Sequence, residues 1–269
     1  FPALDLNHIS VRNDDGVAYL EAMSPVDCIF LDPARRNEHG GKTVAISDCE
    51  PNVAELEGLL LSKANRIMIK LSPMLDLSQA LKELPHTQEV HIISVNNECK
   101  ELLLLLGQTA PEEIPVHCVN LSTKGEQEKQ LFVFTREQEQ HSECSYTDTL
   151  GNYLYEPNAS LLKAGAFRSI AVAYSVKKLH PNSHLYTSET QIEGFPGRTF
   201  RIINRCSLNK KEIKENLSDL KKANITVRNF PATVAELRKR IKLAEGGDTY
   251  LFASTLNDGQ KILIRCGKV

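Results

Sequence analysis

Cys28-Ile29-Phe30-Leu31-Asp32-Pro33-Ala34-Arg35-Arg36 is the most informative segment of this 269-residue chain. Its unbroken apolar run predicts a strand that is buried on both faces, as in a parallel sheet. Pro33 must end that strand, because proline has no N–H for a ladder and restricts the residue before it. Asp32 is therefore expected at the carboxyl end of a central strand, where open α/β sheets bind their ligands.

Two arginines, Arg35 and Arg36, follow this carboxylate directly. Guanidinium groups beside a carboxylate suit a site for a polar or anionic substrate. Two structural alternatives stay open. Asp32 would then only cap the next turn, and the arginines would only hold the loop that follows.

The first half of the chain alternates strand patterns with helix patterns. This alternation predicts a mostly parallel sheet that is covered on both faces. We expect strands at residues 8–12, 28–32, 66–71, 89–95, 115–121 and 130–135, and helices at residues 17–22, 52–62, 77–84 and 98–106.

A polar stretch at residues 138–149 predicts a linker to the second half. The second half repeats a strand–helix–strand theme, which predicts small α+β modules. Asn257-Asp258-Gly259 predicts the turn of a hairpin between the last two strands. We expect helices at residues 159–179, 210–223 and 234–243, and strands at residues 199–206, 225–230, 250–255 and 261–266.

Composition argues against a membrane-spanning, secreted or metal-binding protein. No apolar run approaches the roughly 18 residues that a membrane-spanning helix needs, and the N-terminus shows no basic-then-apolar signal pattern. The seven cysteines are odd in number and none forms a C-x-x-C pair, which favours free thiols in a reducing cytoplasm. The histidines follow no metal-binding spacing. We therefore expect a cytoplasmic protein with no membrane and no metal partner.

The net charge of −2 conceals a division between the two halves. Residues 1–150 carry 12 Lys and Arg against 24 Asp and Glu, whereas residues 151–269 carry 20 against 10. Residues 198–242 are the most basic, with 13 Lys and Arg against four acids. Such a surface suits the phosphates of a nucleic acid, although solvated helices and attraction between the two halves would also account for it.

The order of these motifs resembles a known family. Residues 1–137 resemble the later part of a class I S-adenosylmethionine-dependent methyltransferase. Asp14-Asp15 look like the acidic position that contacts the adenine of the cofactor, and Asp32-Pro33-Ala34-Arg35 is similar to the Asp/Asn-Pro-Pro-x motif after the fourth strand. Residues 31–36 together with 70–76 resemble a bacterial group of methyltransferases that carry a ferredoxin-like segment and a C-terminal THUMP-like domain.

The resemblance implies an α/β fold made of a partial Rossmann-like methyltransferase sheet without its N-terminal strands, followed by small α+β modules. Residues 1–138 would be the later part of the methyltransferase domain, residues 139–198 a linker and ferredoxin-like segment, and residues 199–269 the THUMP-like domain. The implied site residues are Asp32, Pro33 and Arg35 for catalysis, Asp14, Asp15 and Asp32 for the cofactor, and Arg35, Arg36 and Lys70 for the substrate.

The chain departs from the family pattern in two places. It contains no Gly-x-Gly, the turn that lets the backbone approach the cofactor, so we expect an N-terminally truncated fragment that binds S-adenosylmethionine poorly or not at all. Ala34 and Arg35 also replace the aromatic residue with which amino-group methyltransferases stack on a target base. Uracil-C5 methyltransferases instead use a cysteine thiolate, for which Cys99 is the candidate here, with a packing role as the alternative.

The sequence thus predicts a methyltransferase that uses S-adenosylmethionine and acts on RNA through its basic half. Asp32 would make the polar contact to the reacting group. A non-catalytic RNA-binding or scaffold protein with a degenerate methyltransferase fold is the alternative, and a methyltransferase for small molecules or proteins is a third hypothesis.

Overall fold

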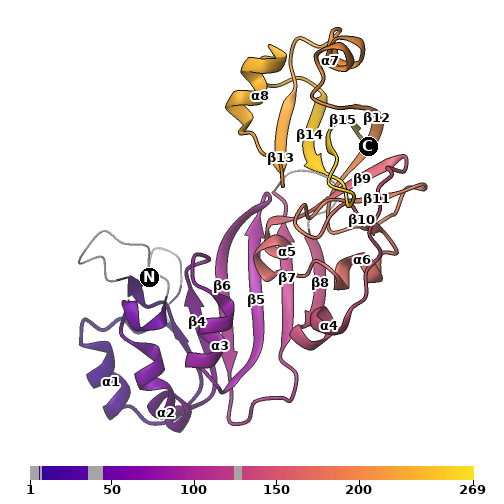
Figure 1. The fold of residues 1–269 in the computed structure, drawn as a ribbon. Helices are drawn as coiled ribbons and strands as arrows, with labels where there is room; N and C mark the ends of the chain where they lie inside the picture. Colours follow the sequence, from indigo (N-terminus) through magenta and orange to yellow (C-terminus); the bar gives the residue numbers. More distant parts are fainter. Residues whose placement is uncertain (1–5, 7, 36–44, 124–128) are drawn as a thin grey trace. The chain divides into compact units, whose positions relative to one another are not determined.

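The computed structural model describes the chain except for residues 1–5, 7, 36–44 and 124–128 (Figure 1). The chain divides into two compact units, which we describe separately. The first unit holds residues 1–90 and 102–114, and the second holds residues 91–101 and 115–269. The division passes through β5 (Thr87–Val95) and β6 (Glu98–Leu106), each of which is an unbroken strand.

A six-stranded sheet has the order β1-β4-β6-β5-β7-β8. β1 pairs with β4 in parallel, β4 pairs with β6 in antiparallel orientation, and so does β7 with β8. The sheet is therefore mixed, and the expectation of a mostly parallel sheet was wrong. The other strands of this sheet are β1 (Val26–Leu31), β4 (Ala64–Leu71), β7 (Pro115–Leu121) and β8 (Lys129–Thr135).

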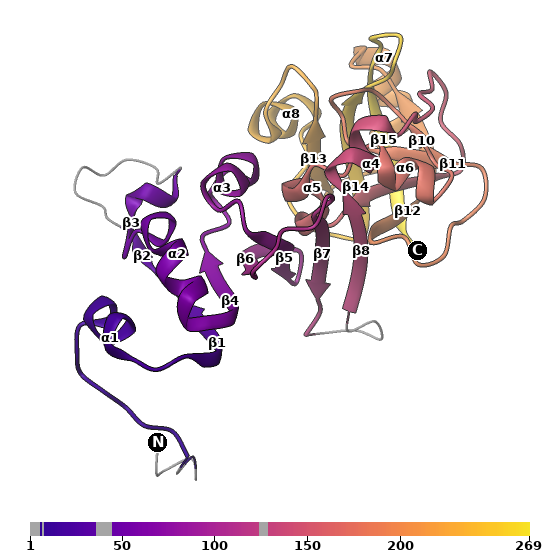
Figure 2. The same cartoon turned by 90° about the horizontal axis from the view of Figure 1, so that it is seen from below.

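Helices cover one face of the first unit's strands. α2 (Val53–Lys63) begins at Asn52, whose side chain accepts a hydrogen bond from the Ala54 N–H, and α3 (Leu77–Glu83) begins at Asp76. In Figure 2, both helices lie on the same side of β4. Because side chains alternate along a strand, one face of β4 and β6 supplies the core. The buried residues of that face are Ile67, Ile69, Leu71, Leu102, Leu104 and Leu106.

The opposite face of these strands is more accessible than the sequence predicts. Phe30 in β1 is 58% exposed, and Met68 in β4 is only half-buried. The expectation of a sheet covered on both faces was therefore wrong for the described residues. The strand expected at residues 8–12 does not form: residue 8 lies in a turn, and residues 9–12 have no regular structure. Among the described residues, α1 (Gly16–Ala22) is the first helix or strand.

The predicted helix at residues 98–106 is instead the strand β6. Asn96 and Asn97, with φ of 50° and 64°, form a two-residue turn that joins β5 directly to β6. Two consecutive residues with positive φ are typical of the tight hairpin turns that match strand twist, and asparagine tolerates this conformation. The leucine run alternates between buried and half-buried positions, which is the period of a strand.

The second unit contains a seven-stranded sheet of order β10-β11-β9-β12-β15-β14-β13. β14 and β15 form the predicted hairpin, and Gly259 takes a φ of 87° in its turn. The strands are β9 (Tyr153–Pro157), β10 (Lys177–Lys178), β11 (Tyr186–Ser188), β12 (Gly197–Cys206), β13 (Asn224–Arg228), β14 (Thr249–Thr255) and β15 (Lys261–Lys268).

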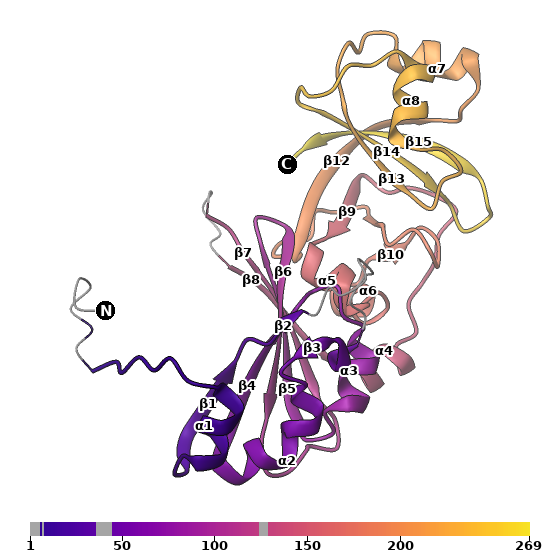
Figure 3. The same cartoon turned by 90° about the vertical axis from the view of Figure 1, so that its left-hand side faces the viewer.

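Two helices, α7 (Lys210–Leu217) and α8 (Val234–Ile241), pack on one face of this sheet (Figure 3). Leu217 and Leu237 form a core there with Leu251 of β14. Phe252, the next residue of β14, packs in a second core with Phe200 of β12. Alternate side chains of one strand therefore serve two hydrophobic cores.

The long helix expected at residues 159–179 is broken into shorter elements. α5 (Ala159–Ala164) ends at Gly165, which takes the left-handed conformation at a φ of 79°. α6 (Ser169–Ala173) follows, and β10 begins soon after it. The Glu139 carboxylate accepts hydrogen bonds from the N–H groups of residues 167–169 and so fixes the start of α6. Glu139 belongs to α4 (Arg136–His141), which occupies part of the predicted linker.

Among the residues that the structure describes, no helix has the length and apolar character needed to cross a membrane.

Candidate functional site

The structure brings together two of the predicted site residues, Asp32 and Lys70. β1 and β4 run in parallel with Leu31 opposite Ile69. The residues that come next, Asp32 and Lys70, therefore lie side by side. Lys70 Nζ lies 2.5 Å from Asp32 Oδ2. The Asp32 side chain is 53% exposed and that of Lys70 is 31% exposed, so a ligand can reach both.

This ion pair contributes little to the stability of the fold, because exposed pairs are worth about 0–1 kcal/mol. The pair is better suited to binding a ligand than to stabilising the fold. Asp32 has oxygens that can accept hydrogen bonds from an N–H or O–H group of a ligand, and the Lys70 ammonium restrains the direction in which the carboxylate points.

The segment after Asp32 is held by a short ladder. β2 (Ala34–Arg35) pairs with β3 (Cys49–Glu50) in antiparallel orientation, with Ala34 opposite Glu50 and Arg35 opposite Cys49. Pro33, which joins Asp32 to this ladder in the sequence, is half-buried. Arg36 lies outside the described residues.

Asp15 has a clear structural role. Its Oδ1 accepts hydrogen bonds from the N–H groups of Val17 and Ala18, both at 2.9 Å, and so caps α1. Asp14 is exposed beside it. A cap of this kind stabilises a helix by about 1 kcal/mol. The acidic pair predicted to contact a cofactor therefore includes one residue that the fold itself uses.

A pocket of about 510 Å³ in the first unit includes Asp15 among its described lining residues, but neither Asp14 nor Asp32. Asn52 Nδ2 donates to Glu55 Oε1 at 2.7 Å in its wall. The pocket is lined by carboxylates and an amide as well as by apolar side chains of α1 and α2. The main lining residues are Asp15, Val17, Glu50, Asn52, Glu55 and Leu56.

Cys99 lies in β6 and is half-buried. Burial raises the pKa of its thiol, and Lys163 and Glu101 act on it in opposite directions. Because the thiolate is the nucleophilic form, a raised pKa leaves Cys99 mainly protonated and unreactive at neutral pH. A packing role fits this environment better than catalysis.

Some positive charges of the basic stretch at residues 198–242 are neutralised by a buried carboxylate of the same unit. Glu156 is only 2% exposed, and Arg198 and Arg228 both bond its carboxylate. Arg228 Nη2 lies 2.9 Å from Glu156 Oε1, and Arg198 Nε lies 2.9 Å from Oε2. These two arginines support the fold by pairing with a buried carboxylate, whereas other exposed cations of this stretch make no pair with Glu156. The exposed ones on the two helices are Lys210, Lys211 and Lys214 of α7 and Lys239 and Arg240 of α8.

A second pocket, of about 710 Å³, lies within the second unit and is lined by amides. Gln130 Oε1 accepts hydrogen bonds from Asn120 Nδ2 and Asn158 Nδ2, while Gln130 Nε2 donates to the Gly197 carbonyl. Sequence reasoning missed this network, because its members come from β7, β8, the cap of α5 and β12, which are spread along the sequence. Only the Asn96-Asn97 turn at its edge has a recognisable local pattern.

Comparisons with known proteins agree with this architecture. The chain is similar to a protein of known structure. That structure is described as the "crystal structure of putative methyltransferase from Porphyromonas gingivalis W83", and it is 40% identical in sequence with a TM-score of 0.81. The match covers 90% of this chain and 60% of that one, so the chain spans about three fifths of its relative.

Family models match the second unit in two adjoining segments. Residues 153–196 match a ferredoxin-like domain, and residues 197–268 match a THUMP domain-like family. No curated protein is significantly similar in sequence. The predicted fold class is therefore confirmed: a mixed α/β sheet in a chain that matches a solved structure described as a "putative methyltransferase", followed by ferredoxin-like and THUMP-like segments.

Proposed function

We propose that the protein is an S-adenosylmethionine-dependent methyltransferase that acts on RNA. The observation that carries this proposal is the Asp32–Lys70 pair at the carboxyl ends of β1 and β4, in a fold that resembles a methyltransferase. Ligands of α/β sheets bind at that edge, and the exposed Asp32 carboxylate there is accessible to a ligand.

The 510 Å³ pocket fits part of a nucleoside cofactor. Its carboxylates and its amide can bond hydroxyl or amino groups, and Val17 and Leu56 offer apolar contacts to a ring. Asp15 and Asn52 would hold the nucleoside. When bound, S-adenosylmethionine supplies an electrophilic methyl group on its sulfonium.

Asp32 would orient the target. Its carboxylate accepts a hydrogen bond from the N–H or O–H group that is to be methylated and attracts the positive charge that develops there. Lys70 holds the carboxylate in place. Catalysis would then consist mainly of positioning and electrostatic stabilisation.

The RNA substrate is supported by the second unit. The exposed lysines of α7 and the exposed cations of α8 lie within the segment that matches a THUMP domain-like family. Lysine ammonium groups attract phosphates without regard to base sequence. These charges would deliver RNA, and the choice of base would belong to the site at Asp32.

The test uses the full-length protein and the variants Asp32→Ala and Asp32→Asn. Transfer of labelled methyl groups from S-adenosylmethionine to cellular RNA should fall by roughly 100-fold or more, as for loss of a group that acts on the reacting proton. RNA binding in a filter assay should be retained. Asp76→Ser is the matched control, since it replaces an aspartate that caps α3 with another capping residue. Unchanged methyl transfer in both Asp32 variants would contradict the proposal.

The second candidate function is RNA binding without catalysis. It is favoured by the exposed cations of α7 and α8, which can attract phosphates whether or not Asp32 acts on a target group. Calorimetry separates the two: heat on mixing the full-length protein with S-adenosylmethionine supports the enzyme, whereas RNA binding without such heat supports the alternative.

A further inference from the structure

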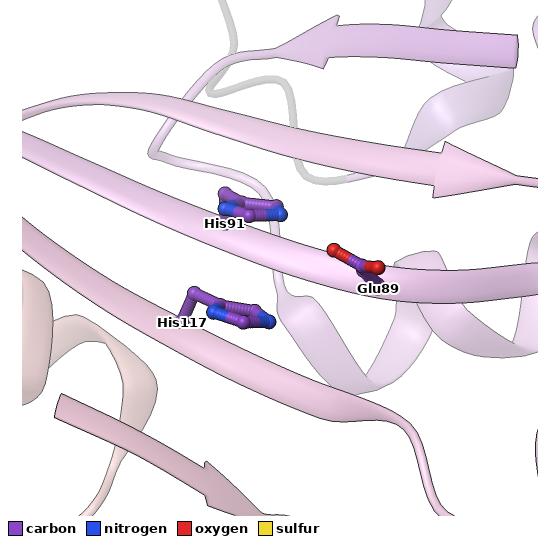
Figure 4. Close-up of side chains that lie close together, drawn as sticks. All are labelled: Glu89, His91 and His117. Atoms are coloured by element: carbon purple, nitrogen blue, oxygen red, sulfur yellow. The ribbon is translucent and has the colours of Figure 1, made fainter.

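β5 and β7 bring a glutamate and two histidines together on one side of the sheet (Figure 4). Glu89 and His91 are two residues apart on the unbroken strand β5, so their side chains point to the same face. His117 lies on β7, the neighbour of β5 in the sheet. The rings of His91 and His117, both in the second unit, stack with centroids 4.4 Å apart and planes 8° apart.

The three side chains offer a compact set of ligand atoms. One imidazole nitrogen from each histidine and one carboxylate oxygen of Glu89 all lie within 4.8 Å of one another. Zinc bonds such atoms at about 2.0–2.2 Å, which places neighbouring ligand atoms roughly 3–3.5 Å apart. To bind one ion, the two stacked rings must also tilt from parallel, so that their nitrogen lone pairs converge, by rotation about their side-chain bonds.

The position of the cluster also suits a metal. All three residues are half-buried, so an ion could enter from solvent and would still be partly shielded. Their strands are firmly anchored, because the residues that alternate with them are fully buried on the other face. These anchoring residues are Val90, Ile92, Val116 and Cys118. A rigid backbone under the ligands reduces the cost of ordering them.

We propose that Glu89, His91 and His117 form a binding site for a divalent transition-metal ion, with Zn²⁺ as the preferred ion. Zinc accepts imidazole and carboxylate ligands and imposes no geometry through its d electrons. Three protein ligands leave a fourth position open for water or an anionic group, as in exchangeable or catalytic zinc sites. The site is separate from Asp32 and does not depend on the proposed methyltransferase activity.

The spacing of these residues along the sequence does not reveal the site. The expectation of no metal site rested on the lack of an H-E-x-x-H pattern, which describes ligands on one helix. Here two ligands have the spacing of a strand, Glu89-Val90-His91, and the third comes from a different strand.

The test is a titration of the purified chain with Co²⁺, followed by absorption spectroscopy, and with Zn²⁺, followed by calorimetry. We expect one equivalent to bind and to give a visible d–d band without strong thiolate charge transfer. His91→Ala and His117→Ala should each weaken binding at least tenfold, and Glu89→Gln, which keeps the side-chain shape, should weaken it as well. His141→Ala removes an exposed histidine of α4 and should leave binding unchanged.

Three results would overturn the proposal. One is the absence of binding to the wild-type chain. The second is a cobalt spectrum dominated by thiolate ligation, which would assign the ion to some of the seven cysteines. The third is equal affinity in the wild type and the two histidine variants. Far-UV circular dichroism of every variant shows that a loss of binding does not reflect a loss of folding.

Discussion

Asp15 and Asp32 show how one residue type acquires two different roles through its surroundings. Asp15 precedes α1, where two unpaired backbone N–H groups point at its carboxylate. Asp32 follows β1 and meets the ammonium group of Lys70 instead. The sequence indicated that both are polar positions at the ends of elements, but not which partner each would find, because Lys70 is 38 residues away along the chain.

Substitution of Asp15 separates its capping role from a role in cofactor binding. Asp15→Ser keeps a capping oxygen and should leave stability within about 0.5 kcal/mol of the wild type, whereas Asp15→Ala should cost about 1 kcal/mol. If Asp15 also holds the cofactor, both variants of the full-length protein should bind S-adenosylmethionine more weakly. Urea unfolding and calorimetry measure the two effects. Cofactor affinity that falls only in the alanine variant would assign Asp15 to helix capping alone.

His184 makes the second unit sensitive to acid. Burial lowers the pKa of its imidazole to about 4, with further lowering by Lys178 and Arg228. The ordinary value is 6.5, so between pH 6.5 and about 4 the unfolded chain binds more protons than the folded one. The free energy of unfolding therefore falls as the pH falls through this range, by at most about 3 kcal/mol from this residue.

His184→Asn tests this dependence, since asparagine tolerates the φ of 52° at this position. The variant loses the stacking of the imidazole on Phe167, so it should be less stable than the wild type at neutral pH. The difference between the two proteins should shrink as the pH falls from 6.5 to 4.5 in urea unfolding. A constant difference across this range would contradict the prediction.

At the scale of elements, local sequence patterns predicted helices and strands correctly where packing in the fold favours the same structure. Strand patterns and turn residues located β4, β5, β7 and the β14–β15 hairpin, and a helix pattern at residues 77–84 located α3. The leucine run at residues 102–106 could not be assigned in this way, because a short apolar run fits a buried helix and a buried strand equally. The Asn96-Asn97 turn decided for the strand.

Two glycines differ in whether their surroundings leave room for a side chain. Gly197 begins β12 beside β9, and a β-carbon there would collide with the backbone of Glu156 and Pro157. Gly58 lies in α2, and a β-carbon there would meet no atom within 4 Å. Gly197→Ala should therefore destabilise the protein by about 1–3 kcal/mol, and Gly58→Ala should stabilise it by about 0.5–1 kcal/mol.

Chemical denaturation of the two glycine variants provides the measurement, and each serves as the control for the other. Equal effects of both substitutions would show that the contact between β9 and β12 is looser than described.

At the scale of the whole molecule, charge predicts how the protein meets RNA. Changing Lys210, Lys211 and Lys214 of α7 to Gln should weaken RNA binding and reduce the slope of log affinity against log salt, by about 0.7–0.9 for each phosphate that the protein no longer neutralises. Filter binding at several salt concentrations measures this. Lys82→Gln, on the exposed surface of α3, is the control and should change neither quantity. An unchanged slope in the triple variant would place RNA elsewhere.

The candidate site was only partly accessible from the sequence. Asp32 could be found because Pro33 fixes the end of its strand, a local effect. The Glu89, His91 and His117 cluster could not, because sheet order brings β5 and β7 together only in the fold. The same holds for Glu156, whose partners Arg198 and Arg228 lie 42 and 72 residues away.

The pairing of β9 with β12 has a consequence for how such proteins can be rearranged over evolutionary time. β9 belongs to the ferredoxin-like match and β12 to the THUMP-like match, yet they are adjacent strands of one sheet. A recombination event that moved residues 197–268 alone would leave β9 and β12 each with an unpaired edge. It would also separate the buried Glu156 from Arg198 and Arg228, which neutralise it. The two segments, although recognised as separate families, are therefore expected to be inherited and exchanged as a single piece.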